Sequence, residues 1–192
     1  MSRILLTAFE PFGGETVNPS MEILHRLSGR PDIDALTVPV TFRDAAAAVL
    51  PHLPGHDAVL MLGQARGRTG LTVERVAINV DDASIADNAK ERPCDQPIVK
   101  NGPAAHFATL PVKAIVEAIR AEGLPAAISN SAGTFVCNHL MYCVLHALEG
   151  SGVRAGFIHV PCLPEQTQGD PAVPAMPLDD MTRGIEAAIR VL

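Results

Sequence analysis

Cys137 is the residue of this 192-residue chain whose position best suits nucleophilic chemistry. The apolar run 126–129 predicts a strand, a loop containing Gly133 follows, and the run 135–148 predicts a helix. Cys137 would then lie in the first turn of that helix. Free backbone N–H groups and the positive end of the helix dipole favour a thiolate there and could also hold an oxyanion. We interpret Cys137 as a nucleophile, although a cysteine in an apolar helix is more often a small core residue.

The other three cysteines suit that role less well. Cys143 falls in the middle of the same predicted helix among apolar residues, as a core residue would. Cys94 lies in an irregular stretch with no base nearby in the sequence, and Cys162 follows a predicted strand and stays a lesser candidate. The spacing of the cysteines matches no CxxC pattern, which argues against a structural metal site.

His159 is the favoured base among seven histidines. It lies near the carboxyl end of the run 154–160, a predicted buried strand, where an imidazole must be hydrogen-bonded or functional. A histidine can take a proton from a thiol at neutral pH and later return it to a leaving amine. His139 lies two positions from Cys137 and would not face it, and His146 is about half a turn round the helix. A hydrogen-bonded core histidine remains the alternative for His159.

Glu74 is the acid that most needs a partner. The run 71–80 alternates as a single strand would, which puts Glu74 on one face with the apolar even-numbered residues that follow it. A carboxylate on an apolar face is costly unless it has a partner, and beside an imidazole it would fix the ring tautomer. The alternative is that Glu74 reaches water at a strand end or pairs with Arg66, Arg68 or Arg75.

Short apolar runs alternate with helical patterns along the chain. Asn18 followed by Pro19 is a typical helix start, and 83–102 is the longest irregular stretch. The expected strands are 4–8, 35–40, 58–62, 71–80, 126–129 and 154–160, and the expected helices 19–27, 41–50, 111–122, 135–148 and 178–191. This alternation predicts one domain over residues 1–192, an α/β sandwich with a largely parallel sheet, whose reactive residues gather at strand ends.

Composition argues against several classes of protein. Apolar residues make up 47% and charged residues 19%, as expected of a folded globular chain. The 15 basic and 21 acidic residues give a net charge of −6, and without a basic stripe we expect no nucleic-acid partner. The N-terminal apolar run is too short for a signal peptide, and no run approaches a membrane span. We therefore expect a cytoplasmic protein with reduced thiols and no membrane association.

With these residues in place, several segments together resemble the pyroglutamyl-peptidase I family of cysteine peptidases, also called pyrrolidone-carboxylate peptidases. They occur in the family's order over nearly the whole chain, and their combination is specific although no single segment would suffice. The segments are LLTAFEPFGG at 5–14 with NPS at 18–20, GQARGR at 63–68, ERVAIN at 74–79, AGTFVCNH at 132–139, and GFIHVP at 156–161 with PEQ at 164–166.

The resemblance implies removal of an N-terminal pyroglutamyl residue from peptides through a thioester, with Cys137, His159 and Glu74 as catalytic triad. It also implies a compact three-layer α/β/α fold with a mixed, mostly parallel sheet, commonly assembled as a homotetramer, and no metal or other cofactor. A small apolar pocket suits a neutral lactam, and core packing is the alternative for its two N-terminal phenylalanines. The pocket residues implied by the resemblance are Phe9, Phe12, Gln64, Phe135 and Val136.

Two positions depart from the family's pattern. Ser84 stands where the family keeps an arginine near the catalytic centre, and Arg66 replaces a glycine in the 63–68 loop. The lost charge weakens the expected support for a thiolate or an oxyanion, which keeps two other functions open. One is a related cysteine amidohydrolase, such as a glutaminase-like enzyme, and the other is a catalytically weakened binding protein.

Overall fold

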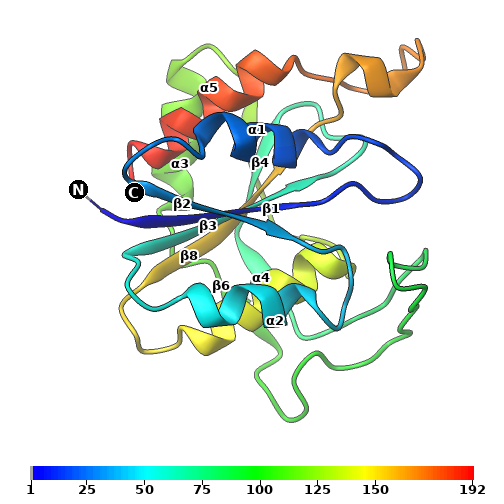
Figure 1. Cartoon of the computed structure of the whole chain (residues 1–192), viewed down its shortest axis with the longest axis vertical. Helices are drawn as coiled ribbons and strands as arrows, with labels where there is room; N and C mark the ends of the chain where they lie inside the picture. Colours follow the sequence, from blue (N-terminus) through cyan, green and yellow to red (C-terminus); the bar gives the residue numbers. More distant parts are fainter. Residues whose placement is uncertain (1) are drawn as a thin grey trace.

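A six-stranded sheet in the order β2-β1-β3-β8-β4-β7 forms the middle layer of the computed structural model, which describes residues 2–192 (Figure 1). All neighbouring strands are parallel except β8 and β4, which pair antiparallel, so the sheet is mixed but mostly parallel. The strands are β1 (Ile4–Phe9), β2 (Ile33–Val38), β3 (Ala58–Gln64), β4 (Leu71–Glu74), β7 (Ala126–Ser129) and β8 (Arg154–Val160).

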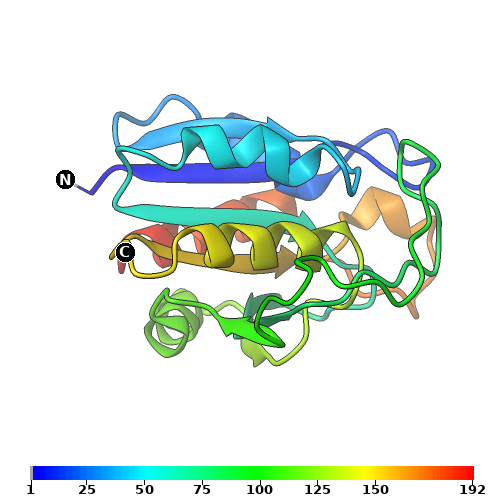
Figure 2. The same ribbon diagram turned by 90° about the horizontal axis from the view of Figure 1, so that it is seen from below.

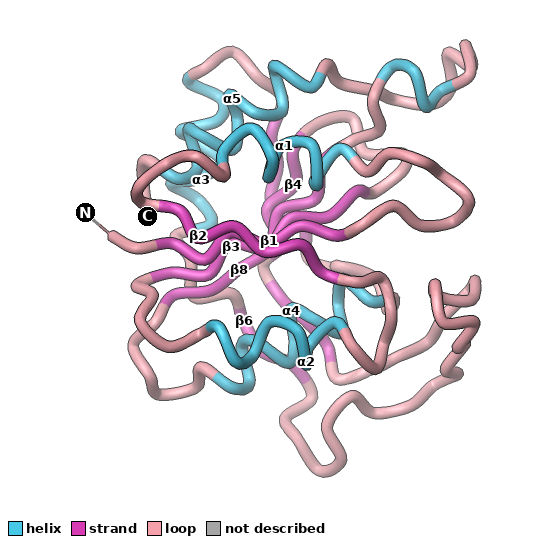
Figure 3. The backbone as a smooth tube through the Cα atoms, in the orientation of Figure 1, coloured by secondary structure: helices cyan, strands magenta, loops and turns pink. Residues whose placement is uncertain are grey.

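Helices cover both faces of this sheet (Figures 1 and 3). One face carries α1 (Pro19–Leu27), α3 (Val112–Ala121) and α5 (Leu178–Ile189), and the other carries α2 (Ala45–Val49) and α4 (Val136–Ala147). Each face encloses its own cluster of buried apolar side chains. Two short 3-10 helices complete the set, η1 (Leu50–His52) and η2 (Pro164–Thr167). The predicted three-layer α/β fold is confirmed.

The hydrophobic pattern explains why the central strands form. Each residue of β1 is buried, and so are the first six of β3, because helices cover both sides of these strands. Burying one such Leu or Ile side chain contributes about 1.5–3 kcal/mol relative to leaving it exposed. The start of α1 forms as predicted, because the Asn18 side chain accepts a hydrogen bond from the Ser20 N–H and Pro19 occupies the first turn.

The predicted strand 71–80 is wrong in one respect that matters for the site. The strand is interrupted at Arg75. β4 therefore ends at Glu74, and β5 (Val76–Ile78) leaves the main sheet to pair with β6 (Ala105–Phe107). Glu74 therefore does not share a sheet face with the residues after it, and periodicity carried the strand too far. The sequence also missed β6, because three residues are too few to show a pattern.

Smaller differences concern element ends. The second strand begins and ends two residues earlier than predicted, and the predicted helix 41–50 is divided into the short α2 and η1. None of the helices in the described part of the chain is long and apolar enough to cross a membrane.

The carboxyl ends of β1, β3 and β8 and the first turn of α4 lie at the same end of the molecule. Figure 2 shows these strands pointing toward one side while α4 runs back across them from that side. The segment between β5 and β6 lies at this end as well. Parallel strands bring their loops together in this way, so residues far apart in the chain can form one site.

Candidate active site

Cys137 lies in the first turn of α4, as predicted. Phe135 caps the helix with an extended backbone, and Cys137 is the second helical residue. The following residue fixes this turn in place, because the Asn138 amide bonds the backbone of Ile78 in both directions and also the carbonyl of Val80. Asn138 is buried and its amide pairs fully with the backbone, so the helix start is tied to β5 rather than left free.

A glycine makes room for the thiol. Gly63 near the end of β3 pairs with His159 on β8, and a Cβ atom added at Gly63 would lie 3.1 Å from Cys137 Sγ and 2.8 Å from a ring carbon of Phe157. Only a residue without a side chain lets the sulfur approach this part of the sheet. The nucleophile is thereby brought over the strand pair that carries His159.

His159 and Glu74 form a buried hydrogen-bonded pair. His159 Nδ1 lies 2.8 Å from Glu74 Oε1, although the two residues are 85 positions apart in the chain. Glu74 is opposite Phe157 in the antiparallel β4–β8 pair, so His159 is its diagonal neighbour on the same face. The exposed fractions are 4% for the His159 side chain and 0% for that of Glu74. With Nδ1–H donated to the carboxylate, Nε2 is left with a free lone pair.

Arg68 is a second partner of Glu74. Its Nη2 lies 3.4 Å from Glu74 Oε1 and equally far from Ser129 Oγ and the Ser131 carbonyl. An ion pair between Glu74 and an arginine was one alternative that the sequence left open. Glu74 in fact contacts both Arg68 and His159. Within residues 2–192, Glu74 Oε2 is buried and has no hydrogen-bond partner. The two cationic or donating neighbours therefore share one carboxylate oxygen.

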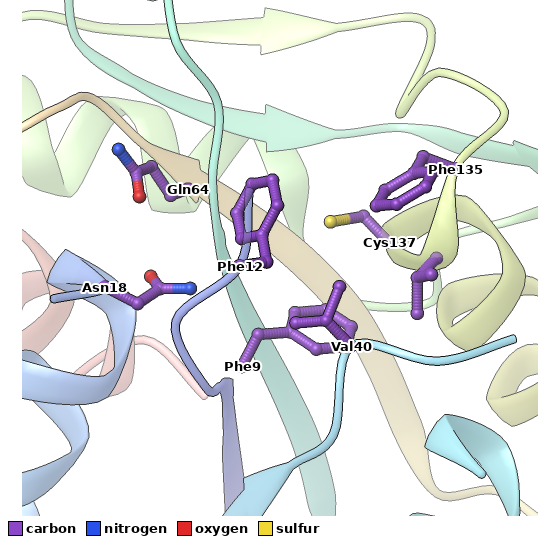
Figure 4. A pocket seen from close by; sticks show the side chains of 8 residues that line it. Phe9, Phe12, Asn18, Val40, Gln64, Phe135 and Cys137 are labelled. Atoms are coloured by element: carbon purple, nitrogen blue, oxygen red, sulfur yellow. The ribbon is translucent and has the colours of Figure 1, made fainter. Parts of the chain in front are cut away.

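An apolar pocket opens beside the thiol (Figure 4). It lies between β1, the end of β3 and the start of α4 and spans about 220 Å³ including space open to solvent, and the Cys137 sulfur points toward its phenylalanine rings. The Phe12 and Phe135 ring centroids are 6.3 Å apart, and Phe42 supports Phe135 edge-on at 5.3 Å. The residues that line the apolar pocket are Phe9, Phe12, Asn18, Val40, Gln64, Phe135, Val136 and Cys137.

A second, larger space, here called the outer cavity, meets the apolar pocket at the thiol. It spans about 910 Å³ including space open to solvent, and both Cys137 and His159 line it. Arg66 and Arg68 also line it, so this space has positively charged side chains in its lining and the apolar pocket has none among the described residues. The two spaces have four lining residues in common, namely Phe12, Gln64, Phe135 and Cys137.

The structure thus brings together all eight residues that the sequence singled out. Cys137, Phe9, Phe12, Gln64, Phe135 and Val136 line the apolar pocket, and His159 joins them through the outer cavity, with Glu74 behind it. The Gln64 side chain is held in place by two contacts outside the pocket lining, because its Nε2 donates to Gln166 at 3.1 Å and lies 3.3 Å from Cys162 Sγ.

The surroundings of Cys137 oppose the thiolate that the helix start alone predicted. Burial and, to a smaller extent, the negative charge of Glu74 raise the pKa of Cys137, the backbone N–H of Cys137 lowers it in part, and together they bring that pKa to about 12. Desolvation disfavours a charged sulfur more strongly than a helix terminus favours it. The thiol is therefore protonated at neutral pH in the free protein, and a base must accept its proton.

The two departures from the family's pattern occupy different places. Ser84 is exposed in the segment after β5 and lines neither the apolar pocket nor the outer cavity. Arg66 is exposed too but lines the outer cavity together with Cys137 and His159. A positive side chain is therefore present near the thiol, on a different loop from the one that the family uses.

Two residues of the site, Gly63 and Val40, were not predicted from the sequence. Asn18 was predicted to start a helix but not to line the pocket. Val40 and Asn18 line the apolar pocket from the loops after β2 and before α1. A glycine near the end of an otherwise apolar strand was the available signal for Gly63, since it often marks a close approach. The sequence carried no comparable signal for Val40.

The sequence also missed a second thiol, imidazole and carboxylate group. His139 Nδ1 lies 2.8 Å from Asp81 Oδ2, and His139 Nε2 lies 3.6 Å from Cys143 Sγ. Burial by itself lowers the pKa of His139, but the bonds to Asp81 and Cys143 outweigh it and raise that pKa to about 9. The i,i+4 spacing of His139 and Cys143 could have indicated half of this group.

A thiol in a helix start, an imidazole at a strand end and a buried carboxylate, on an α/β sandwich, are the groups of a cysteine hydrolase. The family model for pyroglutamyl peptidase matches residues 2–192. The chain is 51% identical to pyrrolidone-carboxylate peptidase 1 of Caldanaerobacter subterraneus subsp. tengcongensis, over 99% of this chain and 97% of that one. It is 51% identical to a Streptococcus pyogenes pyrrolidone-carboxylate peptidase, over 97% and 90%.

Solved structures agree with these relatives. The crystal structure of pyroglutamyl peptidase I from Bacillus amyloliquefaciens superposes with a TM-score of 0.93 at 43% identity, over 100% of this chain and 96% of that one. Pyrrolidone carboxyl peptidase from Thermococcus litoralis gives 0.92 at 37% identity, over 100% and 93%. The chain belongs to the pyroglutamyl peptidase family, which confirms the resemblance seen in the sequence, and it is a cysteine peptidase, a hydrolase, of the class that removes N-terminal pyroglutamate.

Proposed function

We propose that this protein releases N-terminal pyroglutamate from peptides with Cys137 as nucleophile, His159 as proton carrier and Glu74 as the group that orients the imidazole. The observation that carries the proposal is the position of Cys137 where the apolar pocket meets the outer cavity, which is open to solvent and is also lined by His159. A bond cut at this junction would separate a small neutral group from a long polar one.

The apolar pocket is the proposed site of the lactam ring. Pyroglutamate has no free amine, so a carboxylate anchor of the kind that holds a charged N-terminus would serve no purpose, and no acidic side chain lines the pocket within the described residues. Phenylalanine rings on two sides suit a flat, uncharged ring, and the Gln64 amide supplies a polar contact. A glutaminase-like function would need a charged group in this pocket for the free amino acid.

The outer cavity is the proposed path of the rest of the peptide. It is larger than the apolar pocket and open to solvent, so it can admit residues of varied size after the pyroglutamyl group. Arg66 and Arg68 lie in its lining. Their charges suit backbone carbonyls and acidic side chains of the leaving peptide.

The proposed chemistry follows from the charge state of the thiol. Because the Cys137 pKa is raised to about 12, the sulfur attacks as its proton passes to His159 Nε2, and not as a preformed thiolate. His159 makes its hydrogen bond to Glu74, and none links it to Cys137 among the described residues, so substrate binding must close the gap. Sulfur bonds to the pyroglutamyl carbonyl carbon, and the carbon–nitrogen bond breaks as His159 returns the proton to the leaving amine.

The second half of the reaction uses the same groups. Water gives its proton to His159 and attacks the thioester, and the carbon–sulfur bond breaks with return of that proton to the Cys137 sulfur. Free N–H groups in the first turn of α4 lie beside the carbonyl oxygen in both halves and would stabilise its negative charge. Glu74 holds the imidazolium that forms in each half, which is the role of a carboxylate in such a triad.

Cellular and quaternary context completes the proposal. We propose that residues 1–192 act as one domain, because both apolar clusters pack on the same sheet, and that the protein works in the cytoplasm as a homotetramer without a cofactor. Analytical ultracentrifugation of the purified chain tests the assembly, where a single species of four chains is expected and a monomer would refute it.

Hydrolysis of a pyroglutamyl arylamide tests the substrate class. It should be cleaved at least about 100-fold faster, by kcat/KM, than prolyl or glutaminyl arylamides, which keep a charged amine that the apolar pocket cannot pair. Free glutamine should release no ammonia. Absence of pyroglutamyl release would refute the proposal, and ammonia from glutamine would favour the amidohydrolase.

A pocket variant sharpens this test. Phe12→Ala removes one wall of the apolar pocket and should lower kcat/KM for the pyroglutamyl arylamide about tenfold or more. Phe107→Ala is the matched control, because Phe107 is 69% exposed and lines neither the apolar pocket nor the outer cavity. Equal effects of the two variants would show that the apolar pocket does not hold the lactam.

A further inference from the structure

His106, His146 and Glu149 form a group of potential metal ligands away from Cys137. His106 lies on β6, His146 in the last turn of α4 and Glu149 just beyond the end of that helix. One ligand atom of each residue lies within 4.8 Å of the others. Cys137 and His146 are nine positions apart on α4, which is about 14 Å along a helix, so this group is separate from the candidate active site.

The two imidazoles approach each other closely. His106 Nε2 lies 3.0 Å from His146 Nδ1. Two nitrogens that bind one zinc ion at about 2.0–2.1 Å lie about 3.0–3.4 Å apart for ordinary bond angles, so the observed separation already fits a shared cation. A direct N–H···N hydrogen bond has the same length and is the competing explanation.

Packing fixes both rings in this orientation. Tyr142 stacks on His146 with an interplanar angle of 16° and lies 4.8 Å from the His106 ring, and its hydroxyl donates to the Pro103 carbonyl. Preorganised imidazoles lose little entropy on binding a metal.

The site is open to ions and to water. His106 and Glu149 line a surface cavity of about 600 Å³, and the Glu149 side chain is exposed. Two imidazole nitrogens and one carboxylate oxygen leave at least one coordination position for water. Such a ligand set suits Zn²⁺, Co²⁺ or Ni²⁺ better than Mg²⁺ or Ca²⁺, which prefer oxygen ligands only.

We propose that His106, His146 and Glu149 bind one divalent transition-metal ion, Zn²⁺ as the first choice, and that the ion ties the two-stranded β5–β6 sheet to the end of α4. Asn138 already ties the start of α4 to β5. The ion would make a second tie at the other end of the same helix. A neutral imidazole whose proton lies on the facing nitrogen moves it to the other ring nitrogen on binding, so the two neutral rings release no net proton.

Calorimetric titration with Zn²⁺ is the first experiment, on the full chain carrying Cys137→Ser so that the active-site thiol cannot compete. One ion per chain is expected. Co²⁺ as a probe should give visible bands typical of nitrogen and oxygen ligands, without the near-ultraviolet band of a cobalt–thiolate bond. No saturable binding, or a thiolate band that disappears in Cys94→Ala, would overturn the proposal.

Single substitutions locate the ion. His106→Gln and His146→Gln should each weaken Zn²⁺ binding at least about tenfold, and Glu149→Gln severalfold. His25→Gln is the matched control, an exposed histidine on α1, and should bind as the parent does. Unchanged affinity in both His106→Gln and His146→Gln would leave the hydrogen bond as the sole explanation of their contact.

Thermal unfolding supplies a second readout. Zn²⁺ should raise the Tm of the parent chain and not that of His106→Gln, because only an ion bound to the folded state stabilises it. Circular dichroism without metal shows whether each variant folds. Should a histidine variant fail to fold, Glu149→Gln replaces an exposed side chain and keeps the test decisive, since full retention of affinity and Tm rise would contradict the proposed ligand set.

Discussion

Two groups of thiol, imidazole and carboxylate each take their thiol from α4, and among the described residues only the first group has both its thiol and its imidazole in the lining of the outer cavity. In the first, Cys137 adjoins the apolar pocket and shares the outer cavity with His159, whose Nδ1 is 2.8 Å from Glu74. In the second, His139 joins Asp81 at the same 2.8 Å and approaches Cys143 at 3.6 Å. Each group even has one buried carboxylate oxygen without a partner in residues 2–192, on Glu74 and on Asp81.

The two groups differ in the helices and strands that carry their residues. His159 and Glu74 come from two strands and Cys137 from a helix start, and the thiol and the imidazole both line the outer cavity. His139 and Cys143 are one turn apart on one helix, already in contact, and Cys143 lines neither the apolar pocket nor the outer cavity. The second imidazole holds its proton to about pH 9 and cannot serve as a base at neutral pH. Residue types alone do not define a catalytic group.

Removing the two thiols one at a time should give the largest difference in kcat. Cys137→Ala should lower kcat for a pyroglutamyl arylamide by about 10⁴-fold or more, because the step that forms the thioester is lost. Cys143→Ala should keep kcat within about threefold. Steady-state kinetics on both variants decides, and an active Cys137→Ala with an inactive Cys143→Ala would reverse the two assignments. Cys94→Ala and Cys162→Ala should also retain turnover.

The two histidines offer the next contrast. His159→Gln should lower kcat about 10³-fold or more without a large change in KM, because the proton carrier is missing. His139→Gln should keep most activity but lower the free energy of unfolding by about 1–3 kcal/mol, since it leaves Asp81 buried without its partner. Urea denaturation beside kinetics separates these effects, and a large loss of kcat in folded His139→Gln would contradict the comparison.

The two carboxylates should differ in their effect on the active thiol. Glu74→Gln should lower kcat by about 10²- to 10⁴-fold, because the imidazole loses its orienting partner. It should also move the pH profile of Cys137 alkylation to lower pH, because the Glu74 charge helps to raise the Cys137 pKa. Iodoacetamide labelling followed by mass spectrometry measures that profile. Asp81→Asn is the control and should leave it in place.

The smallest expected effect concerns stability against pH. The His139 pKa is raised from 6.5 to about 9 in the folded protein, so protonated His139 stabilises the fold fully below pH 6.5. This contribution is lost as the pH rises from 6.5 through 9. In His139→Gln the decline of Tm over that range should become shallower by a few degrees. An identical decline in parent and variant would show that His139 does not hold its proton as described.

Much of the fold and of the candidate site could be predicted from the sequence. The apolar runs of β1, β3 and β8 are buried on both faces and cannot be mistaken for surface segments, and Asn18-Pro19 is a strong local helix start. Cys137, His159 and Glu74 each stood out by a local mismatch between residue type and expected position. The family's segments then connected them, over nearly the whole chain.

Only the tertiary structure decided how these residues act on one another. The break at Arg75, which ends β4 at Glu74, depends on pairing with β7 and β8 and leaves no trace in the alternation of 71–80. The state of the Cys137 thiol was also beyond the sequence. A helix start is a local feature and favours a thiolate, whereas the desolvation and the Glu74 charge that raise its pKa come from residues brought near by folding. The sequence therefore identified which residues could carry out the chemistry, whereas the pKa of Cys137 was determined by the residues that pack around it in the folded protein.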